Sequence, residues 1–89
     1  MVSRLDVSVV IPTWRCSYIL EACLPSVLNA CDRYREASGS RTEVVVVEDA
    51  GGDDTPVWLR STWGQRIRLI EHGWNLGFSA ACQTGFEQA

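Results

Sequence analysis

Lysine is absent from this sequence, and the eight arginines are outnumbered by eleven aspartates and glutamates, which leaves a net charge of −3. Proteins that bind nucleic acid or another polyanion usually present a basic surface, so this balance argues against such a partner. Without lysine the chain also cannot form a P-loop, because the G-x-x-x-x-G-K motif requires one. We therefore expect no nucleic-acid partner and no P-loop.

Long hydrophobic runs are missing as well. The longest aliphatic run is Val44 to Val47, whereas a membrane-spanning helix needs about 20 apolar residues. Asp6 and Pro12 lie where a signal peptide would have its apolar stretch. We expect a soluble, cytoplasmic chain without a membrane segment or a targeting signal.

Residues that bind metals or form disulfides are few. His72 is the single histidine and no C-x-x-C pair occurs, so the sequence offers no zinc-binding pattern. Four cysteines could form two disulfides, but Cys23 and Cys31 lie two helical turns apart, about 12 Å, which is too far to bridge. We expect buried, reduced thiols at Cys16, Cys23, Cys31 and Cys82, as in a cytosolic protein.

What the chain does have is apolar residues in short, regular patterns. Its 89 residues, 46% of them hydrophobic, suffice for one small domain and not for two. Two β-branched runs without alternation predict strands buried on both faces, at Asp6 to Ile11 and at Glu43 to Glu48. The alternating run Arg66 to Glu71 predicts a third strand.

Helical periodicity follows each predicted strand. An apolar stripe runs from Ile19 to Cys31, where Pro25 predicts a kink or an early break, and Glu36 to Thr42 are predicted to form a polar loop. A short helix is predicted at Pro56 to Trp63. The last apolar stripe consists of Phe78, Ala81, Cys82, Gly85, Phe86 and Ala89.

Strands that alternate with helices predict an α/β fold, a three-layer αβα sandwich around a Rossmann-like parallel sheet with right-handed crossovers. We expect the first strand beside the second and the second beside the third. In such sheets ligands bind beyond the carboxyl ends of the strands. The candidate site is therefore shared by three loops, Pro12 to Ser17, Asp49 to Asp54 and His72 to Gly77.

The first of these loops excludes one common nucleotide site. It reads P-T-W-R-C-S and has no glycine, whereas a dinucleotide-binding turn needs glycines so that the pyrophosphate can approach the backbone. Trp14 could instead stack on a nucleobase, or pack as a lid over the helix. Asp49, at the end of the valine strand, could accept a hydrogen bond from a base or ribose, or cap a turn.

The third loop offers an amide and two glycines. Gly73 and Gly77 permit positive φ and a close backbone approach, and the Asn75 side chain can pair with backbone or ligand. The alternative is a tight turn that only starts the last helix. His72 could be a general base, but no partner for it is evident, so we interpret it as a loop residue.

Three blocks of the sequence resemble the family 2 glycosyltransferases of the GT-A fold. They read V-S-V-V-I-P-T-W-R (residues 7–15), V-V-V-V-E-D-A-G-G-D-D-T (44–55) and N-L-G-F-S-A-A-C-Q-T-G (75–85). In the family the blocks commonly read V-S-V-V-I-P-T-Y-N, V-V-D-D-G-S-x-D-x-T and N-x-G-F-x-x-A-x-N-x-G. Here they occur in the family's order and span nearly the whole chain.

The resemblance implies a single partial GT-A domain, the nucleotide-diphospho-sugar transferase fold. Such an enzyme transfers a sugar from a nucleotide-diphosphate sugar, such as a UDP-sugar, to an acceptor. The resemblance places the base beside Pro12, Thr13 and Trp14, with Asp49 accepting a hydrogen bond from uracil or an equivalent ring. It implies that the turn from Asn75 to Gly77 supports the edge of the nucleotide.

The chain also departs from the family's blocks. Five usual residues are replaced, with Trp14 for Tyr, Arg15 for Asn, Glu48 for the first Asp, Cys82 for a frequent Arg and Gln83 for Asn. The family's D-x-D element, which holds Mg²⁺ or Mn²⁺ against the diphosphate, does not occur in residues 1–89. The resemblance therefore implies a divalent metal for the full-length enzyme and none bound by this fragment, which we expect to be inactive alone.

Two other functions are compatible with the same half-fold. A non-catalytic nucleotide-binding or protein-interaction module is the main alternative to an enzyme. A nucleotidyltransferase is disfavoured, because it would need a glycine-rich first loop and basic phosphate contacts. Whatever the function, the strand from Asp6 to Ile11 is expected to have one open edge. This edge predicts self-association of the chain.

Overall fold

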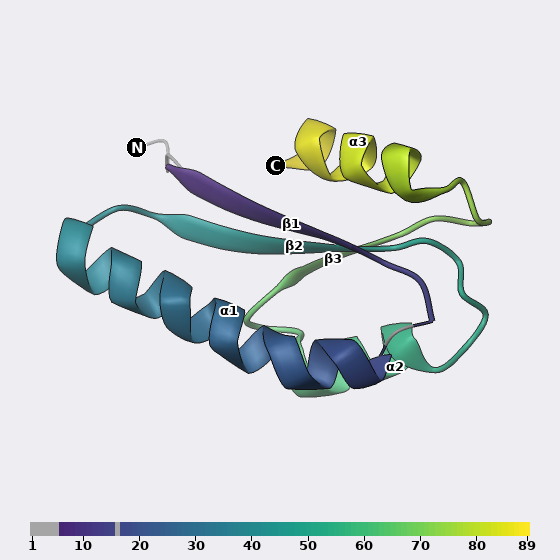
Figure 1. Ribbon diagram of the computed structural model, residues 1–89, viewed down its shortest axis with the longest axis horizontal. Helices are drawn as coiled ribbons and strands as arrows, with labels where there is room; N and C mark the ends of the chain where they lie inside the picture. Colours follow the sequence, from purple (N-terminus) through teal and green to yellow (C-terminus); the bar gives the residue numbers. More distant parts are fainter. Residues whose placement is uncertain (1–5, 16) are drawn as a thin grey trace.

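Three strands and three helices alternate along the chain in the computed structural model, which describes residues 6–15 and 17–89 (Figure 1). The elements are β1 (Val7–Thr13), α1 (Ser17–Ser38), β2 (Thr42–Glu48), α2 (Thr55–Trp63), β3 (Arg68–Glu71) and α3 (Phe78–Gln88). Each predicted strand and helix is present, and the boundaries differ from the prediction by a few residues.

The strands form one parallel sheet in the predicted order β1-β2-β3. Val10 lies opposite Val45, and Val46 opposite Leu69, so the carboxyl ends of the strands share one edge of the sheet. Figure 1 shows α1 and α2 on one face of the sheet and α3 on the other. The predicted three-layer αβα sandwich is therefore confirmed.

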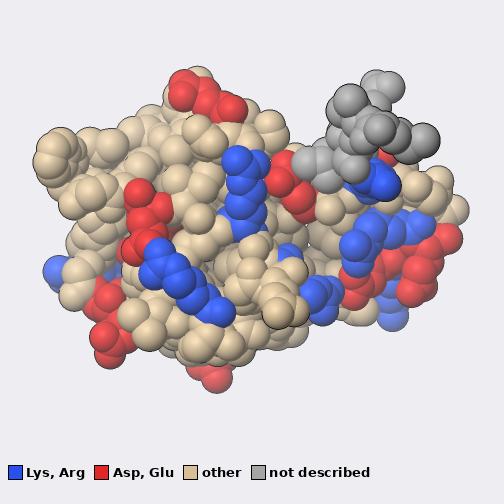
Figure 2. Space-filling view, turned by 180° about the vertical axis from the view of Figure 1, so that it is seen from behind, with Lys and Arg blue, Asp and Glu red and all other residues tan. Residues whose placement is uncertain are grey.

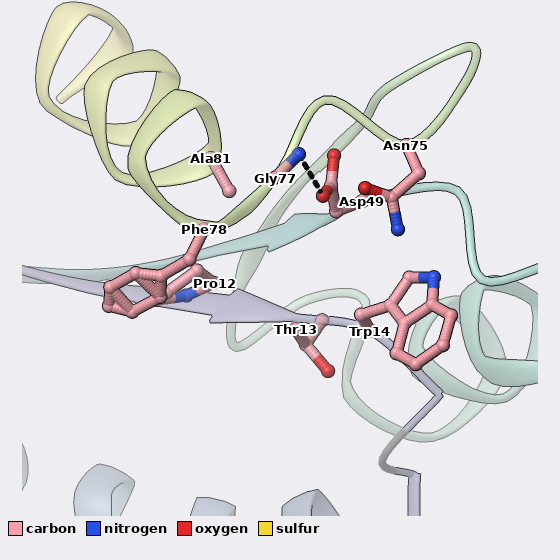
Figure 3. Close-up of a pocket in the computed structure, with 8 residues that line it drawn as sticks. All are labelled: Pro12, Thr13, Trp14, Asp49, Asn75, Gly77, Phe78 and Ala81. Carbon is pink, nitrogen blue, oxygen red and sulfur yellow. Dashed lines mark hydrogen bonds between the residues drawn. The ribbon is translucent and has the colours of Figure 1, made fainter.

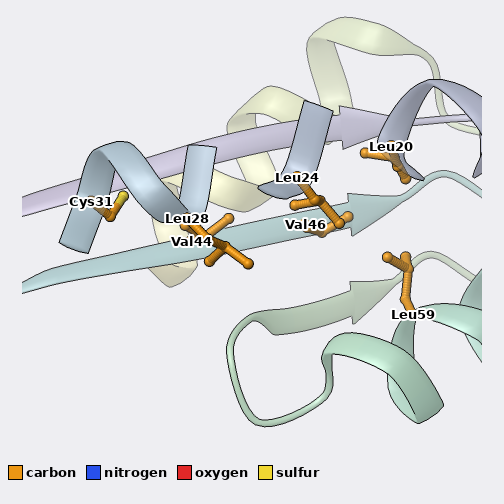
Figure 4. Close-up of a cluster of buried hydrophobic side chains, with 7 residues drawn as sticks. All are labelled: Leu20, Leu24, Leu28, Cys31, Val44, Val46 and Leu59. Carbon is orange, nitrogen blue, oxygen red and sulfur yellow. The ribbon is translucent and has the colours of Figure 1, made fainter. Parts of the chain in front are cut away.

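The central strand β2 is buried on both faces, which explains its unbroken run of valines. Val44 and Val46 pack in one apolar cluster with side chains of α1 and α2, namely Leu20, Leu24, Leu28, Cys31 and Leu59 (Figure 4). Val45 and Val47 face the opposite layer, where they pack against Ala81 of α3. Burying each of these valines stabilises the fold by about 1.5–3 kcal/mol, so β2 fixes the positions of both helical layers.

The first strand was predicted to end at Ile11, before Pro12, but β1 continues through Pro12 to Thr13. The carbonyl of Thr13 accepts a hydrogen bond from the N–H of Asp49 (2.8 Å), so the backbone of Thr13 faces β2. The nitrogen of Pro12, one residue earlier, then faces the outer edge of the sheet. Proline is tolerated there because no ladder hydrogen bond to β2 needs its missing N–H.

α1 is longer than predicted and shows no break at Pro25. Pro25 has no N–H to donate to the carbonyl of Glu21, four residues earlier in the helix. Both residues are exposed, so water can replace the missing hydrogen bond. The apolar face of the helix, buried against β2, offsets the remaining cost. The helix continues to Ser38 and is followed by Gly39 (φ 72°), a left-handed position that suits glycine. The predicted polar loop is correspondingly shorter.

α3 approaches the sheet through its small residues and not through its aromatic ones. Ala81 and Gly85 are buried, whereas Phe78 and Phe86 are 69% and 65% exposed. The predicted apolar stripe is therefore wrong for the two phenylalanines. A Cβ at Gly85 would overlap Cγ1 of Val10 on β1, so the contact is too close to leave room for a ring between helix and sheet.

The substitution Gly85→Ala is expected to destabilise the fold by about 1–3 kcal/mol, because the new methyl group must displace Val10 or α3. The better helix propensity of alanine offsets at most about 1 kcal/mol of this. Combined with Val10→Ala, which restores the space, the two substitutions should cost less than the sum of the single ones. Urea unfolding followed by circular dichroism measures all three variants. An unchanged midpoint for Gly85→Ala would contradict the close contact.

Surface arginines lie next to acidic residues. Figure 2 shows charges of both signs interspersed over one face of the molecule. Ion pairs join Arg66 to Asp32 (3.1 Å) and Arg68 to Glu43 (3.7 Å). The face in Figure 2 is therefore of mixed sign, unlike the basic stripe of a polyanion-binding protein.

The cysteines and the helices bear on the predicted thiols and on the expected lack of a membrane segment. Cys23, Cys31 and Cys82 carry free thiols, but only Cys31 is buried, so the predicted burial is wrong for the other two. Cys16 lies outside the described residues. None of the described helices is both long and apolar enough to cross a bilayer.

Within the described residues, β1 has a partner strand on one side only. An apolar groove of about 390 Å³ lies between β1 and α1, lined by Val7, Val9, Val27, Ala30, Cys31, Tyr34 and Thr42. The open edge expected for the first strand is present. Self-association through this edge stays a prediction.

Candidate functional site

A pocket of about 300 Å³ opens at the carboxyl ends of β1 and β2, next to the loop that leads into α3. Its lining comes from three separate segments of the chain, and consists of Pro12, Thr13, Trp14, Asp49, Asn75, Gly77, Phe78 and Ala81 (Figure 3). All six residues predicted for the site are among them. The parallel register brings them together, because it aligns the strand ends and the loops that follow.

Asp49 follows the last residue of β2, is only 4% exposed, and has its carboxylate held by protein donors. Oδ1 accepts hydrogen bonds from Nδ1 of His72 (2.7 Å) and from the N–H of Leu76 (2.9 Å). Oδ2 accepts one from the N–H of Gly77 (2.8 Å), drawn as a dashed line in Figure 3. Asp49 therefore fixes the loop before α3, as the turn-capping interpretation predicts, and lines the pocket as well.

Gly77 gives this loop its shape. Its φ of 97° and ψ of 166° belong to a region that is essentially restricted to glycine. In this conformation its N–H points to Asp49, while its carbonyl accepts the N–H of Ala81 (3.0 Å) in the first turn of α3. Gly77 thus connects the carboxylate of Asp49 to the start of the helix.

His72 is a buried partner of Asp49, so its interpretation as a loop residue without a partner is wrong. The imidazole is 8% exposed and makes hydrogen bonds through both nitrogens, Nδ1 to Asp49 (2.7 Å) and Nε2 to Oγ1 of Thr84 on α3 (2.8 Å). The parallel register could have revealed this pair. Glu48 lies opposite Glu71, so the next residues, Asp49 and His72, lie side by side.

The charge on Asp49 is stabilised despite its burial. Burial alone raises the pKa of a carboxyl group, but hydrogen bonds from His72, Leu76 and Gly77 more than compensate. The pKa of Asp49 therefore lies below its usual value, and the group is an ionised hydrogen-bond acceptor at neutral pH.

Glu48 points to the other face of the sheet and has a different role. Its Oε1 accepts the N–H of Gly51 (2.9 Å), while Oε2 is buried without a partner among the described residues. Burial raises the pKa of Glu48, and the charges of Asp53 and Asp49 add to this, against the opposing hydrogen bond from Gly51. Glu48 shapes the β2–α2 loop and does not line the pocket beside Asp49.

Arg15 ties the first loop to the second and supports Trp14. It has a positive φ of 50°, its Nε donates to the carbonyl of Gly51 (2.5 Å), and its guanidinium lies 4.9 Å from the centre of the Trp14 ring. A Cβ at Gly51 would lie 2.9 Å from Cγ of Arg15, so the two loops meet closely only with glycine there. Sequence reasoning assigned Arg15 no role, since its contact with Gly51 is between loops 36 residues apart.

The described residues do not form a metal site. In residues 6–15 and 17–89, no group of three His, Cys, Asp or Glu side chains is placed to hold an ion. Within these residues, the divalent metal that the family implies therefore has no ligand cluster of that size.

In open α/β sheets ligands bind beyond the carboxyl ends of the strands, which is where this pocket lies, lined by a carboxylate, an indole and an amide. The sequence profile of glycosyl transferase family 2 matches residues 8–89. The chain therefore belongs to glycosyl transferase family 2. No curated protein matches it.

A solved structure with a similar fold is the mannosyltransferase PcManGT from Pyrobaculum calidifontis, in complex with GDP-Man and Mn²⁺. The two sequences are 28% identical and the structures have a TM-score of 0.76. The match covers 98% of this chain and 25% of the mannosyltransferase chain. The chain thus has the GT-A fold and spans about a quarter of the length of that enzyme.

Gly77→Ala is expected to destabilise the chain by about 1–3 kcal/mol, because alanine strains the backbone at this φ. Gly73→Ala is the matched control, since Gly73 is in the same loop, has no positive φ and has open space around it. Thermal unfolding of both variants measures the difference. Equal losses of stability would contradict the role given to the Gly77 conformation.

Stability should depend on the ionisation of Asp49. Because its pKa is lowered on folding, its contribution is complete above its ordinary value of 3.8 and is lost as the pH falls toward the lower pKa of the folded state. Asp49→Asn should reduce the free energy of unfolding at pH 7 by about 1.5–3 kcal/mol. The difference from the wild type should shrink on acidification to about pH 3. Chemical denaturation across this range measures it, and a difference independent of pH would contradict the prediction.

Proposed function

We propose that the pocket binds the base of a nucleotide-diphosphate sugar, and that the chain is the donor-binding part of a family 2 glycosyltransferase. The observation that carries this proposal is the convergence of Trp14, Asp49 and Asn75 from three loops on one pocket at the carboxyl edge of the sheet. A pocket of about 300 Å³ is at the lower end of the range for small-ligand sites, which suits a nucleoside.

Each of these three side chains offers a different interaction to a base. The indole of Trp14 is half exposed and can stack on an aromatic ring, with the Arg15 guanidinium over the indole to support it. Oδ2 of Asp49 has one protein donor, so it can accept a second hydrogen bond from a ring N–H. The amide of Asn75 points toward Trp14 in Figure 3 and makes no hydrogen bond within the described residues. It can therefore pair with a base carbonyl.

Transfer of the sugar makes demands beyond binding the base. A divalent ion that neutralises the leaving diphosphate would supply the main electrostatic stabilisation, and the solved mannosyltransferase holds Mn²⁺. Residues 6–15 and 17–89 offer no ligand cluster for such an ion. We infer that the chain binds the donor and does not catalyse transfer by itself. A cytoplasmic location is part of the proposal, and the free thiols of Cys23, Cys31 and Cys82 support it.

Titration of the chain with uridine diphosphate tests the proposal. The wild type should bind, and Asp49→Ala should weaken binding by about 10- to 150-fold, the effect of losing one hydrogen bond to a buried charge. Asp54→Asn is the matched control, because Asp54 is an exposed aspartate of the same β2–α2 loop and lies outside the pocket lining. Calorimetry or amide chemical shifts measure the affinities. If no nucleoside diphosphate binds, the protein-interaction module is the better interpretation.

A further inference from the structure

The carboxylate of Asp49 has a limited number of acceptor positions left for a ligand. Each carboxylate oxygen accepts about two hydrogen bonds. Both positions of Oδ1 are taken, by Nδ1 of His72 and by the N–H of Leu76. Oδ2 has one described donor, the N–H of Gly77, so a single position remains. A ligand can therefore donate only one hydrogen bond to Asp49, and it cannot donate to both carboxylate oxygens at once.

His72 cannot easily vacate its position on Oδ1. Its backbone N–H donates to the carbonyl of Glu48 (2.9 Å), which continues the sheet, and its Nε2 is bonded to Oγ1 of Thr84 on α3. The ring is thus anchored at both ends and is 8% exposed. Since an ionised carboxylate only accepts hydrogen bonds, Nδ1 carries the hydrogen that lies between His72 and Asp49.

We propose that His72 sets the base specificity of the pocket by occupying Oδ1 of Asp49. The remaining acceptor fits the imide edge of uracil or thymine, which has one ring N–H between two carbonyls. Guanine presents a ring N–H and an amino group side by side, and would need both oxygens of the carboxylate. Adenine and cytosine present a ring nitrogen lone pair, which a carboxylate repels. This inference rests on the proposed function, and it selects a uridine or thymidine diphosphate sugar as the donor.

The neighbouring amide supports the same choice. The side chain of Asn75 points toward Trp14 in Figure 3 and lines the same pocket, so it can donate to one of the two carbonyls that flank the imide N–H. The solved mannosyltransferase was determined with GDP-Man, so this chain would bind a different base from the guanine bound by that enzyme. His72 alone would account for this difference. With Oδ1 occupied, the amino group of guanine would have no acceptor, which weakens the binding of guanine.

Two variants of His72 distinguish this role from simple structural support. Asparagine places its amide N–H near the position of Nδ1, so His72→Asn keeps Oδ1 occupied. Glutamine reaches toward the position of Nε2, so His72→Gln keeps the bond to Thr84 and frees Oδ1. The readout is the ratio of the dissociation constants of GDP and UDP, measured by calorimetry for each protein. Partial unfolding scales both constants alike and leaves this ratio unchanged.

The wild type and His72→Asn should bind UDP about 10-fold or more tightly than GDP, and in His72→Gln the ratio should fall toward one. A wild-type ratio near one, or a ratio that His72→Gln leaves unchanged, would overturn the role of His72 while leaving the proposed function intact. Failure of the wild type to bind UDP, GDP or any other nucleoside diphosphate would instead refute the proposed function. If His72→Gln does not fold, the wild-type ratio and its retention in His72→Asn still decide.

Discussion

One buried carboxylate, that of Asp49, connects the layers of this small fold at the edge where the pocket lies. It joins the end of β2 to the loop before α3 through Leu76 and Gly77, and to α3 itself through His72 and Thr84. A charge that is 4% exposed is tolerable only because these donors satisfy it. The same donors leave part of Oδ2 for a ligand, so the loop support and the candidate binding group are one side chain.

The packing around β2 makes this arrangement possible. Valines on both faces of β2 hold the helical layers, and Ala81 and Gly85 bring α3 close to the sheet. With a larger residue at Gly85, α3 would lie farther out, and Thr84, the residue before it, would move away from His72. The small residues of α3 thus serve the site as well as the core, which explains why the helix exposes its phenylalanines instead of burying them.

Much of the fold and the pocket lining could be predicted from the sequence, because both follow from strand periodicity. The valine run defined the central strand. Parallel strands bring their carboxyl ends together, so Trp14, Asp49 and Asn75 could be expected to lie near one another, and they line one pocket. His72 was misinterpreted because its partner depends on the register of β2 and β3. The exposure of Phe78 and Phe86 could not be predicted either, since helical periodicity does not say which residues of a stripe make the closest contact.

The central claim is that Asp49 holds the loop and binds the base at the same time. A crystal structure of the chain with uridine diphosphate tests it most directly. We expect the uracil ring against the indole of Trp14, with its ring nitrogen about 2.7–3.2 Å from Oδ2 of Asp49, and the hydrogen bonds from Leu76 and Gly77 retained. A base bound away from Trp14, or a carboxylate that releases the loop amides in order to reach the base, would contradict the claim.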